Sequence, residues 1–219
     1  MKRPPPGEKP SIIDSRAVEP FYKNGYLVGS RDSTEVVYID PGEEVESILE
    51  LVSTRQRELV AILLTHAHMD HISGIARVRE QHDAPIYLHP DDRHLYQSLP
   101  AQAQFFGFQY GPAPPVDREL SDHQVLELAG LEFKVHLTPG HSPGHVCFEV
   151  EQHIFCGDVV FQGSIGRTDL PGGSSEVLLS SIQERVLPLG DERLLYPGHG
   201  PQTTIGQERR TNPFLVGMA

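Results

Sequence analysis

Thr65-His66-Ala67-His68-Met69-Asp70-His71 directly follows the apolar run over residues 59–64. The stretch places histidines and an aspartate at the carboxyl end of a predicted buried strand. Imidazole and carboxylate groups together suit Zn, Fe or Mn, and the lack of thiolates argues against a closed structural zinc site. Such a ligand set leaves a coordination position open for water, as catalytic metal sites do. The stretch therefore predicts a catalytic metal centre, in preference to a polar loop whose histidines cap a helix.

Further motifs downstream end in residues of the same kind, each after a short apolar run. They are Thr138-Pro139-Gly140-His141, Cys156-Gly157-Asp158 and Tyr196-Pro197-Gly198-His199. If each run is a strand, four strand ends can supply six or seven ligands to one rim of a sheet. The repeated pattern makes a chance cluster of polar residues a poor explanation.

Composition excludes several classes of partner. The chain carries 18 Lys and Arg against 30 Asp and Glu, a net charge of −12, and its positive residues do not cluster. Nucleic acid and anionic membranes are therefore not expected to bind through bulk charge. Residues 1–9 lack the apolar core of a signal peptide, and no stretch is long enough to span a membrane. Two cysteines cannot make a disulfide framework, so a cytoplasmic protein is expected.

The 219 residues suffice for one large domain, and no composition break favours two. Residues 1–20 are expected to be an irregular, proline-rich leader. Residues 100–115 mix aromatics with glycine and proline, which predicts either a functional lid or an ordinary surface loop. Helices are predicted over 43–57, 71–81, 91–98 and 174–187. Strands are predicted over 25–29, 35–40, 59–64, 86–89, 124–128, 131–137, 146–150, 153–157 and 193–196.

The order of these motifs, with His-x-His-x-Asp-His at its centre, resembles the metallo-β-lactamase superfamily and its glyoxalase II-like hydrolases. The resemblance covers residues 21–199. It implies a four-layer αββα sandwich over residues 21–219, with the metal site at one edge. Strand and helix periodicity alone would indicate only an α/β or α+β fold.

The resemblance also implies a ligand set for two divalent ions per chain, with zinc favoured over iron or manganese. His66, His68 and His141 would hold one ion, Asp70, His71 and His199 the second, and Asp158 would bridge them. A carboxylate can span two ions about 3.5–4 Å apart, the separation typical of two-metal hydrolases.

Two further residues are expected to support the ligands. Asp40, in Asp40-Pro41-Gly42, matches the first motif of the family and would orient a metal-binding histidine; it would equally suit a cap for the helix that begins near residue 43. His145 is expected to play a supporting role as well, because the ligand set is complete without it.

The resemblance implies a small-molecule substrate, a glutathione thioester such as S-lactoylglutathione. A dinuclear centre lowers the pKa of bound water, so that hydroxide can attack the carbonyl at neutral pH. Asp70 could accept the proton of that water. Arg167, in Gly163-Ser164-Ile165-Gly166-Arg167, lies where the family places a basic residue for the glutathione carboxylate. The alternative is a structural arginine that stabilises the loop after Asp158.

The main alternative is a persulfide dioxygenase of the same fold, which oxidises glutathione persulfide with a single iron and also carries Gly-Arg-Thr-Asp. That family tends to replace the histidine equivalent to His145, and it tends to read Pro-Ala-His-Asp-Tyr where this chain has Pro197-Gly198-His199-Gly200-Pro201. The hydrolase is therefore favoured. Lactone or β-lactam hydrolysis and a purely structural metal-binding module are weaker alternatives.

Overall fold

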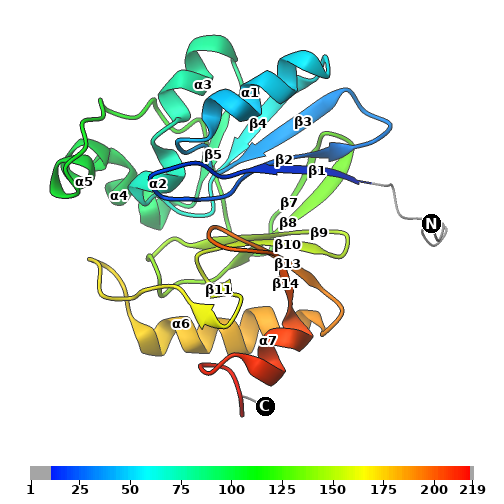
Figure 1. Cartoon of the computed structure of the whole chain (residues 1–219), viewed down its shortest axis with the longest axis vertical. Coiled ribbons are helices and arrows are strands. Elements are labelled where there is room, and N and C mark those ends of the chain that lie inside the picture. Colours follow the sequence, from blue (N-terminus) through cyan, green and yellow to red (C-terminus); the bar gives the residue numbers. More distant parts are fainter. Residues whose placement is uncertain (1–10, 218–219) are drawn as a thin grey trace.

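The computed structural model describes residues 11–217, with side chains from residue 13 onward. Two large sheets pack face to face, and helices cover the outer face of each (Figure 1). The predicted four-layer αββα sandwich is therefore confirmed. Three clusters of buried apolar side chains fill the two helix–sheet layers and the space between the sheets.

The first sheet has strand order β1-β2-β3-β4-β5-β6, and its strands from β3 onward are parallel. Their bounds are β1 (Ser11–Arg16), β2 (Gly25–Ser30), β3 (Glu35–Ile39), β4 (Glu58–Leu63), β5 (Ile86–Leu88) and β6 (Arg118–Glu119). β4 is buried on both faces, because Ile62 packs toward the helices while Ala61 and Leu63 pack between the sheets. A parallel strand covered on both faces is a continuous apolar run, as the sequence has here.

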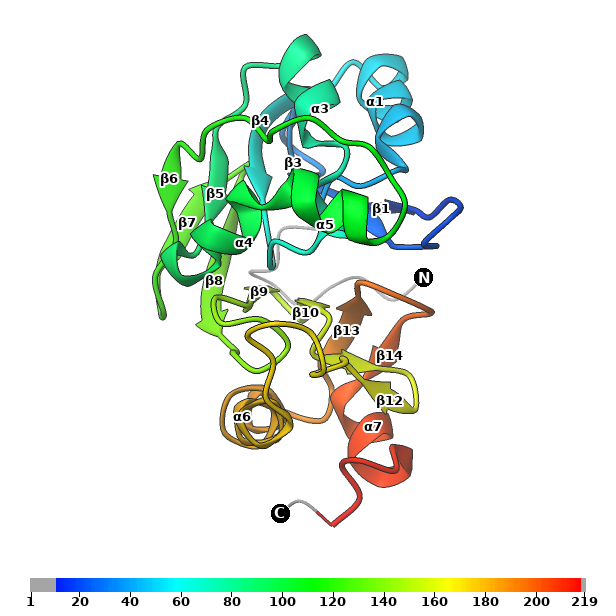
Figure 2. The ribbon, with the colours of Figure 1, turned by 90° about the vertical axis from the view of Figure 1, so that its left-hand side faces the viewer.

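The helices α1 (Val45–Thr54) and α3 (Ile75–Gln81) cover this sheet. The buried residues of α1 are Val45, Ile48, Leu49 and Val52, the spacing of one helix face. The helices α4 (Arg93–Gln97) and α5 (Leu99–Phe105) lie at one end of the sandwich (Figure 2), beside α2 (Met69–Ile72; Figure 1). The short turn η1 (Pro90–Asp92) directly precedes α4.

The second sheet has the order β14-β13-β10-β9-β8-β7. Its strands are β7 (Val125–Leu128), β8 (Leu131–Leu137), β9 (Val146–Val150), β10 (His153–Gly157), β13 (Leu194–Pro197) and β14 (Thr203–Thr204). Its outer layer contains α6 (Ser175–Ser181), η2 (Ile182–Val186), η3 (Leu187–Leu189) and α7 (Ile205–Thr211), and a small hairpin joins β11 (Val160–Phe161) to β12 (Ser164–Ile165). In β8, Leu131, Phe133 and Val135 alternate with exposed residues and point between the sheets.

The irregular leader expected over residues 1–20 is wrong for residues 11–16. Ser11–Arg16 forms β1, an edge strand that pairs antiparallel with β2. The segment has no alternating apolar pattern, so the open edge of β2 rather than local propensity defines the strand. Residues 1–10 of the expected leader lie outside the described residues.

The helix predicted over 71–81 is broken into α2 and α3 at Ser73-Gly74. The loop after β3 crosses this break, where the Gly74 amide donates to the Pro41 carbonyl at 3.0 Å. A Cβ on Gly74 would lie 2.2 Å from the Gly42 carbonyl oxygen, and one on Gly42 would lie 2.2 Å from that of Asp70. The paired glycines bring Asp40 and Asp70 into one region.

The loop predicted over 100–115 is helical at its start, where α5 runs to Phe105 with a proline in its first turn. Leu99 and Ala103 bury the inner face of α5, which explains a helix that lacks a full apolar period. The remainder is irregular, and Phe108 and Tyr110 pack against the first sheet's helix-side core. The lid stays a prediction.

Across residues 11–217, no helix combines the length and apolar character needed to cross a membrane. The turn at Glu151-Gln152 joins β9 to β10 as a two-residue hairpin. Cys147 and Cys156 on these strands are both buried and free, and burial raises the pKa of the Cys147 thiol to about 12. Neither thiol is suited to redox chemistry in this state.

Substituting Gly74→Ala is expected to lower the free energy of unfolding by about 1–3 kcal/mol, the usual cost of overpacking against fixed atoms. Denaturant unfolding measures the change. Gly111→Ala is the matched control, because a Cβ there meets nothing within 4 Å. Equal stability of the two variants would contradict the close approach of the 40–42 loop to α3.

Candidate metal centre

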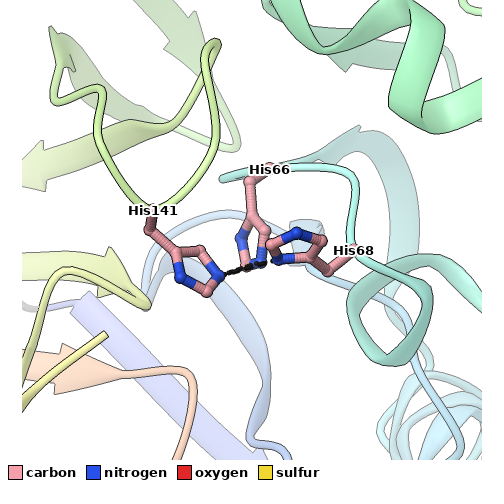
Figure 3. Close-up of side chains that lie close together, drawn as sticks. All are labelled: His66, His68 and His141. Carbon is pink, nitrogen blue, oxygen red and sulfur yellow. Dashed lines mark hydrogen bonds between the residues drawn. The ribbon is translucent and has the colours of Figure 1, made fainter. Parts of the chain in front are cut away.

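Three buried imidazoles meet at the ends of two strands (Figure 3). His66 and His68 follow β4, and His141 follows β8. The Nε2 atom of His141 lies 2.8 Å from Nδ1 of His68 and 3.2 Å from Nε2 of His66. The structure thus brings together the three residues predicted to share one metal.

Hydrogen bonds around this cluster fix which ring nitrogens carry protons. Nδ1 of His141 donates to the Arg167 carbonyl at 2.7 Å, so its Nε2 holds a lone pair. The Thr65 hydroxyl donates to Asp40 and therefore accepts from Nδ1 of His66 at 3.0 Å. Two lone pairs consequently face each other between His66 and His141, an arrangement that a shared cation stabilises.

A proton does not bind between His66 and His141 to relieve this repulsion, because burial disfavours a charged imidazole. Burial, with the neighbouring histidines, lowers the pKa of His66 well below its usual range. The same causes lower the pKa of His68 to about 3. His66 and His68 are therefore neutral, which is the protonation state that metal ligation requires of imidazole.

A second group joins Asp70, His71 and His199. Nε2 of His199 lies 3.0 Å from the Asp70 carboxylate, and Nε2 of His71 lies 3.7 Å from it. Burial lowers the pKa of His71, but the carboxylates of Asp70 and Asp158 outweigh it and raise this pKa to about 10. This group attracts positive charge, either a proton or a metal ion.

Asp158 lies between the two groups. Its Oδ1 is 3.4 Å from Nε2 of His71, and its Oδ2 is 3.6 Å from Nε2 of both His141 and His199. Oδ1 of Asp158 and Nε2 of His71 are buried without a hydrogen-bond partner within residues 11–217. Buried polar atoms rarely lack partners, so the donor set fits divalent cations on both sides of this carboxylate.

Asp40 orients His71 and does not cap α1. Its carboxylate accepts from the Thr65 amide at 2.7 Å, from the Thr65 hydroxyl at 2.6 Å and from Nδ1 of His71 at 3.0 Å. α1 has no side-chain cap. Below this turn, the buried Lys23 ammonium donates to the Asp40 carbonyl and pairs with Glu44 at 2.8 Å. A fixed acceptor at Nδ1 directs Nε2 of His71 at the second group.

His145 contacts the main chain of Asp158 instead of entering the centre. Its Nε2 accepts from the Asp158 amide at 3.1 Å, and its Nδ1 lies 3.0 Å from the Thr138 hydroxyl. Its ring stacks on that of His66 with centroids 5.0 Å apart. Both nitrogens are used, which agrees with a supporting role.

Asp92 is a supporting residue that the sequence did not reveal. It is fully buried, and its carboxylate accepts from the Ala67 amide at 3.0 Å, the Ser142 hydroxyl at 2.7 Å and the Gly144 amide at 2.6 Å. It therefore ties the loop after β4 to the loop after β8. Asp92 belongs to no motif and precedes an ordinary short helix, so only the folded chain reveals its contacts.

The motif glycines leave room for these contacts. A Cβ on Gly198 would lie 2.2 Å from Oδ1 of Asp158, and one on Gly166 would lie 1.9 Å from its carbonyl oxygen. Either side chain would displace Asp158, which explains glycine before His199 and before Arg167.

A cavity of about 380 Å³ opens beside both groups. Metal-centre residues line its floor, Phe21, Phe106, Phe161 and Leu170 line its walls, and Arg167 lies at its rim. A larger cavity of about 730 Å³ lies at the β7–β8 and β9–β10 turns, away from the four motifs. The larger cavity is therefore not the candidate site. The smaller cavity is, because the two His/Asp groups lie beside it.

The order of motifs and this geometry agree with a family model. Residues 18–199 match the model of the metallo-β-lactamase superfamily. The chain belongs to this superfamily. Hydroxyacylglutathione hydrolase GloC of Haemophilus influenzae is 41% identical over 212 residues, which cover 93% of this chain and 97% of that protein.

Solved structures agree with the assignment. The BLEG-1 B3 metallo-β-lactamase has a TM-score of 0.88 at 41% identity and covers 94% of this chain and all (100%) of its own. TTHA1623 in a di-iron-bound form has a TM-score of 0.84 at 43% identity, and the match covers 92% of this chain and 100% of that chain. ETHE1 from Myxococcus xanthus has a TM-score of 0.80 at 26% identity, covering 94% and 85%.

Replacing Asp92→Asn is expected to weaken metal retention about 10- to 100-fold, as loss of an outer-shell partner does. The amide NH₂ cannot accept from both loops, so the loops after β4 and β8 separate. Metal content after dialysis against graded chelator measures the effect. Asp91→Asn is the control, since that neighbouring carboxylate is exposed. Wild-type retention by Asp92→Asn would contradict the role of Asp92.

Proposed function

We propose that this metallo-β-lactamase superfamily hydrolase cleaves a glutathione thioester such as S-lactoylglutathione. The observation that carries the proposal is the carboxylate of Asp158, which faces both His/Asp groups on the floor of a cavity. The identity to hydroxyacylglutathione hydrolase over most of the chain supports the reaction class.

The proposed ligands are the converging residues of the two groups. His66, His68 and His141 would hold one divalent ion, Asp70, His71 and His199 the other, and Asp158 both. Two ions bound there would lower the pKa of water and polarise a carbonyl oxygen. Zinc is the proposed metal, and the similarity to a di-iron-bound structure keeps iron as the first alternative, ahead of manganese.

Asp70 is the proposed proton acceptor as well as a ligand. Its carboxylate is close to His199, and it lines the cavity where substrate would approach. Burial raises its pKa, but His71 and His199 outweigh burial and lower this pKa to about 2. A carboxylate with so low a pKa is a weak base, so metal binding is the better supported of its two roles.

The remaining residues position substrate. The apolar walls of the cavity exclude water from the thioester carbon, and Arg167 is the cation at the rim that a substrate carboxylate would meet. A small-molecule partner fits a cavity of this size. The cytoplasmic location and the absence of nucleic-acid and membrane partners remain predictions.

Persulfide oxidation by a single iron is the alternative. His145 argues against it, because the dioxygenase family tends to replace this histidine, whereas here it contacts Thr138 and the Asp158 amide. Gly198 also favours the hydrolase, because the lack of a side chain there lets Asp158 approach His71 and His199. A site with two groups favours two-metal hydrolysis.

Metal-assayed protein is expected to hydrolyse S-lactoylglutathione without consuming oxygen, at about two metal ions per chain. Oxygen uptake on glutathione persulfide is recorded in parallel with thioester loss. Asp158→Asn is the control, and its turnover is expected to fall by at least about 100-fold, beyond the usual loss for an outer-shell residue.

Oxygen uptake with one iron per chain and no thioester loss would contradict the hydrolase and establish the dioxygenase. Turnover that survives in Asp158→Asn would contradict the role of Asp158 as the shared ligand.

A further inference from the structure

The substrate cavity has few polar groups outside the metal centre. Its other lining residues are apolar except for Gln102, Ser164 and Arg167. The Gln102 amide is already engaged, since its Oε1 accepts from the Met69 amide at 3.0 Å and its Nε2 donates to carbonyls of Ala67 and Leu95. Arg167 is the only arginine or lysine among the cavity-lining residues within 11–217.

That arginine is paired with a neighbour. Nε and Nη2 of Arg167 donate to the two carboxylate oxygens of Asp169, each at 2.7 Å. The hydrogen bonds from Arg167 lower the pKa of Asp169 to about 2, so this carboxylate is charged at neutral pH. The two-pronged contact occupies one edge of the guanidinium, the geometry in which arginine would otherwise bind a substrate carboxylate.

The backbone holds this pair at the cavity rim. The Arg167 carbonyl accepts from Nδ1 of His141 at 2.7 Å, and Gly166 packs against the Asp158 carbonyl. The segment is therefore fixed to the metal centre on its main-chain side, while the side chains of Arg167 and Asp169 are half exposed or more. Rearrangement of the exposed ion pair does not require rearrangement of the centre.

We propose that Asp169 is a specificity-determining residue that competes with a substrate carboxylate for Arg167 and thereby weakens selection for anionic thiol carriers. This inference rests on the proposed thioester hydrolysis and names its substrate class. The cavity then recognises the thioester mainly at the metal centre and along apolar walls, and the carboxylates of a carrier such as glutathione share Arg167 with Asp169. Thioesters of small neutral thiols are equally good substrates.

Binding of unreactive thioethers to the metal-loaded protein tests the inference apart from turnover. The probes are S-hexylglutathione and S-hexyl-N-acetylcysteamine, which share the hexyl sulfide and differ in carrier charge. Wild type is expected to bind them with affinities within about threefold. Asp169→Asn is expected to strengthen S-hexylglutathione binding about two- to fivefold, the range of an exposed ion pair, and to leave the neutral probe unaffected.

Two further variants make the result specific. Adding Arg167→Ala to Asp169→Asn is expected to remove the gain, because the gain needs the freed guanidinium. Asp191→Asn makes the same charge change at an exposed ion pair with Arg209, away from the cavity, and is expected to alter neither affinity.

Several results would overturn the inference. A wild-type affinity for S-hexylglutathione more than about tenfold above that for the neutral probe is one, and failure of both probes to bind is another. The others are no gain in S-hexylglutathione affinity in Asp169→Asn, and a gain that persists when Arg167 is also replaced. Absence of thioester turnover alone would instead contradict the proposed function, so the two failures are distinguishable.

Discussion

The close approach of two buried imidazoles, those of His66 and His141, is the contact that the surrounding structure must stabilise. Nε2 of His66 and Nε2 of His141 lie 3.2 Å apart, and the hydrogen bonds at their Nδ1 atoms leave both without a proton. Beside them, Oδ1 of Asp158 and Nε2 of His71 are buried 3.4 Å apart as an ion pair, and neither atom has a hydrogen-bond partner among the described residues. Burial of such groups costs free energy unless a cation is shared among them. Without a metal the centre thus lowers the free energy of unfolding, and metal binding to the folded chain would raise it.

A second layer of buried polar groups holds the ligand loops against this repulsion. Asp40 fixes the loop after β4 through Thr65 and His71, and Asp92 joins the loops after β4 and β8. The main-chain amide of Asp158 donates to His145. The His199 loop is held by the segment that precedes β2, since the Asn24 main-chain amide donates to the Gly198 carbonyl at 2.7 Å and Lys23 pairs with His199 as an isolated β-bridge. The loops that carry the proposed ligands are therefore positioned by other elements of the sandwich, which agrees with a centre that depends on the complete fold.

Local sequence predicted most of this candidate site, because the proposed ligands follow strands whose apolar patterns are strong. The apolar run 59–64 and the alternation in β8 predict where the chain reaches the sheet edge, and the His/Asp motifs directly follow. What escaped prediction depends on contacts between distant residues. β1 pairs with an open edge, α5 is defined by burial of Leu99 and Ala103, and Asp92 acquires its partners only when two loops meet. The Asp169 contact with Arg167 involves neighbours, yet its consequence depends on a cavity formed by several elements.

Anomalous diffraction from crystals of the metal-loaded protein tests the central claim most directly. Two metal peaks about 3.5–4 Å apart are expected, with Asp158 contacting both ions. One ion is expected beside Nε2 of His66, Nδ1 of His68 and Nε2 of His141, and the other beside Asp70, His71 and His199. A single peak beside either group, or an ion that does not contact Asp158, would contradict the account.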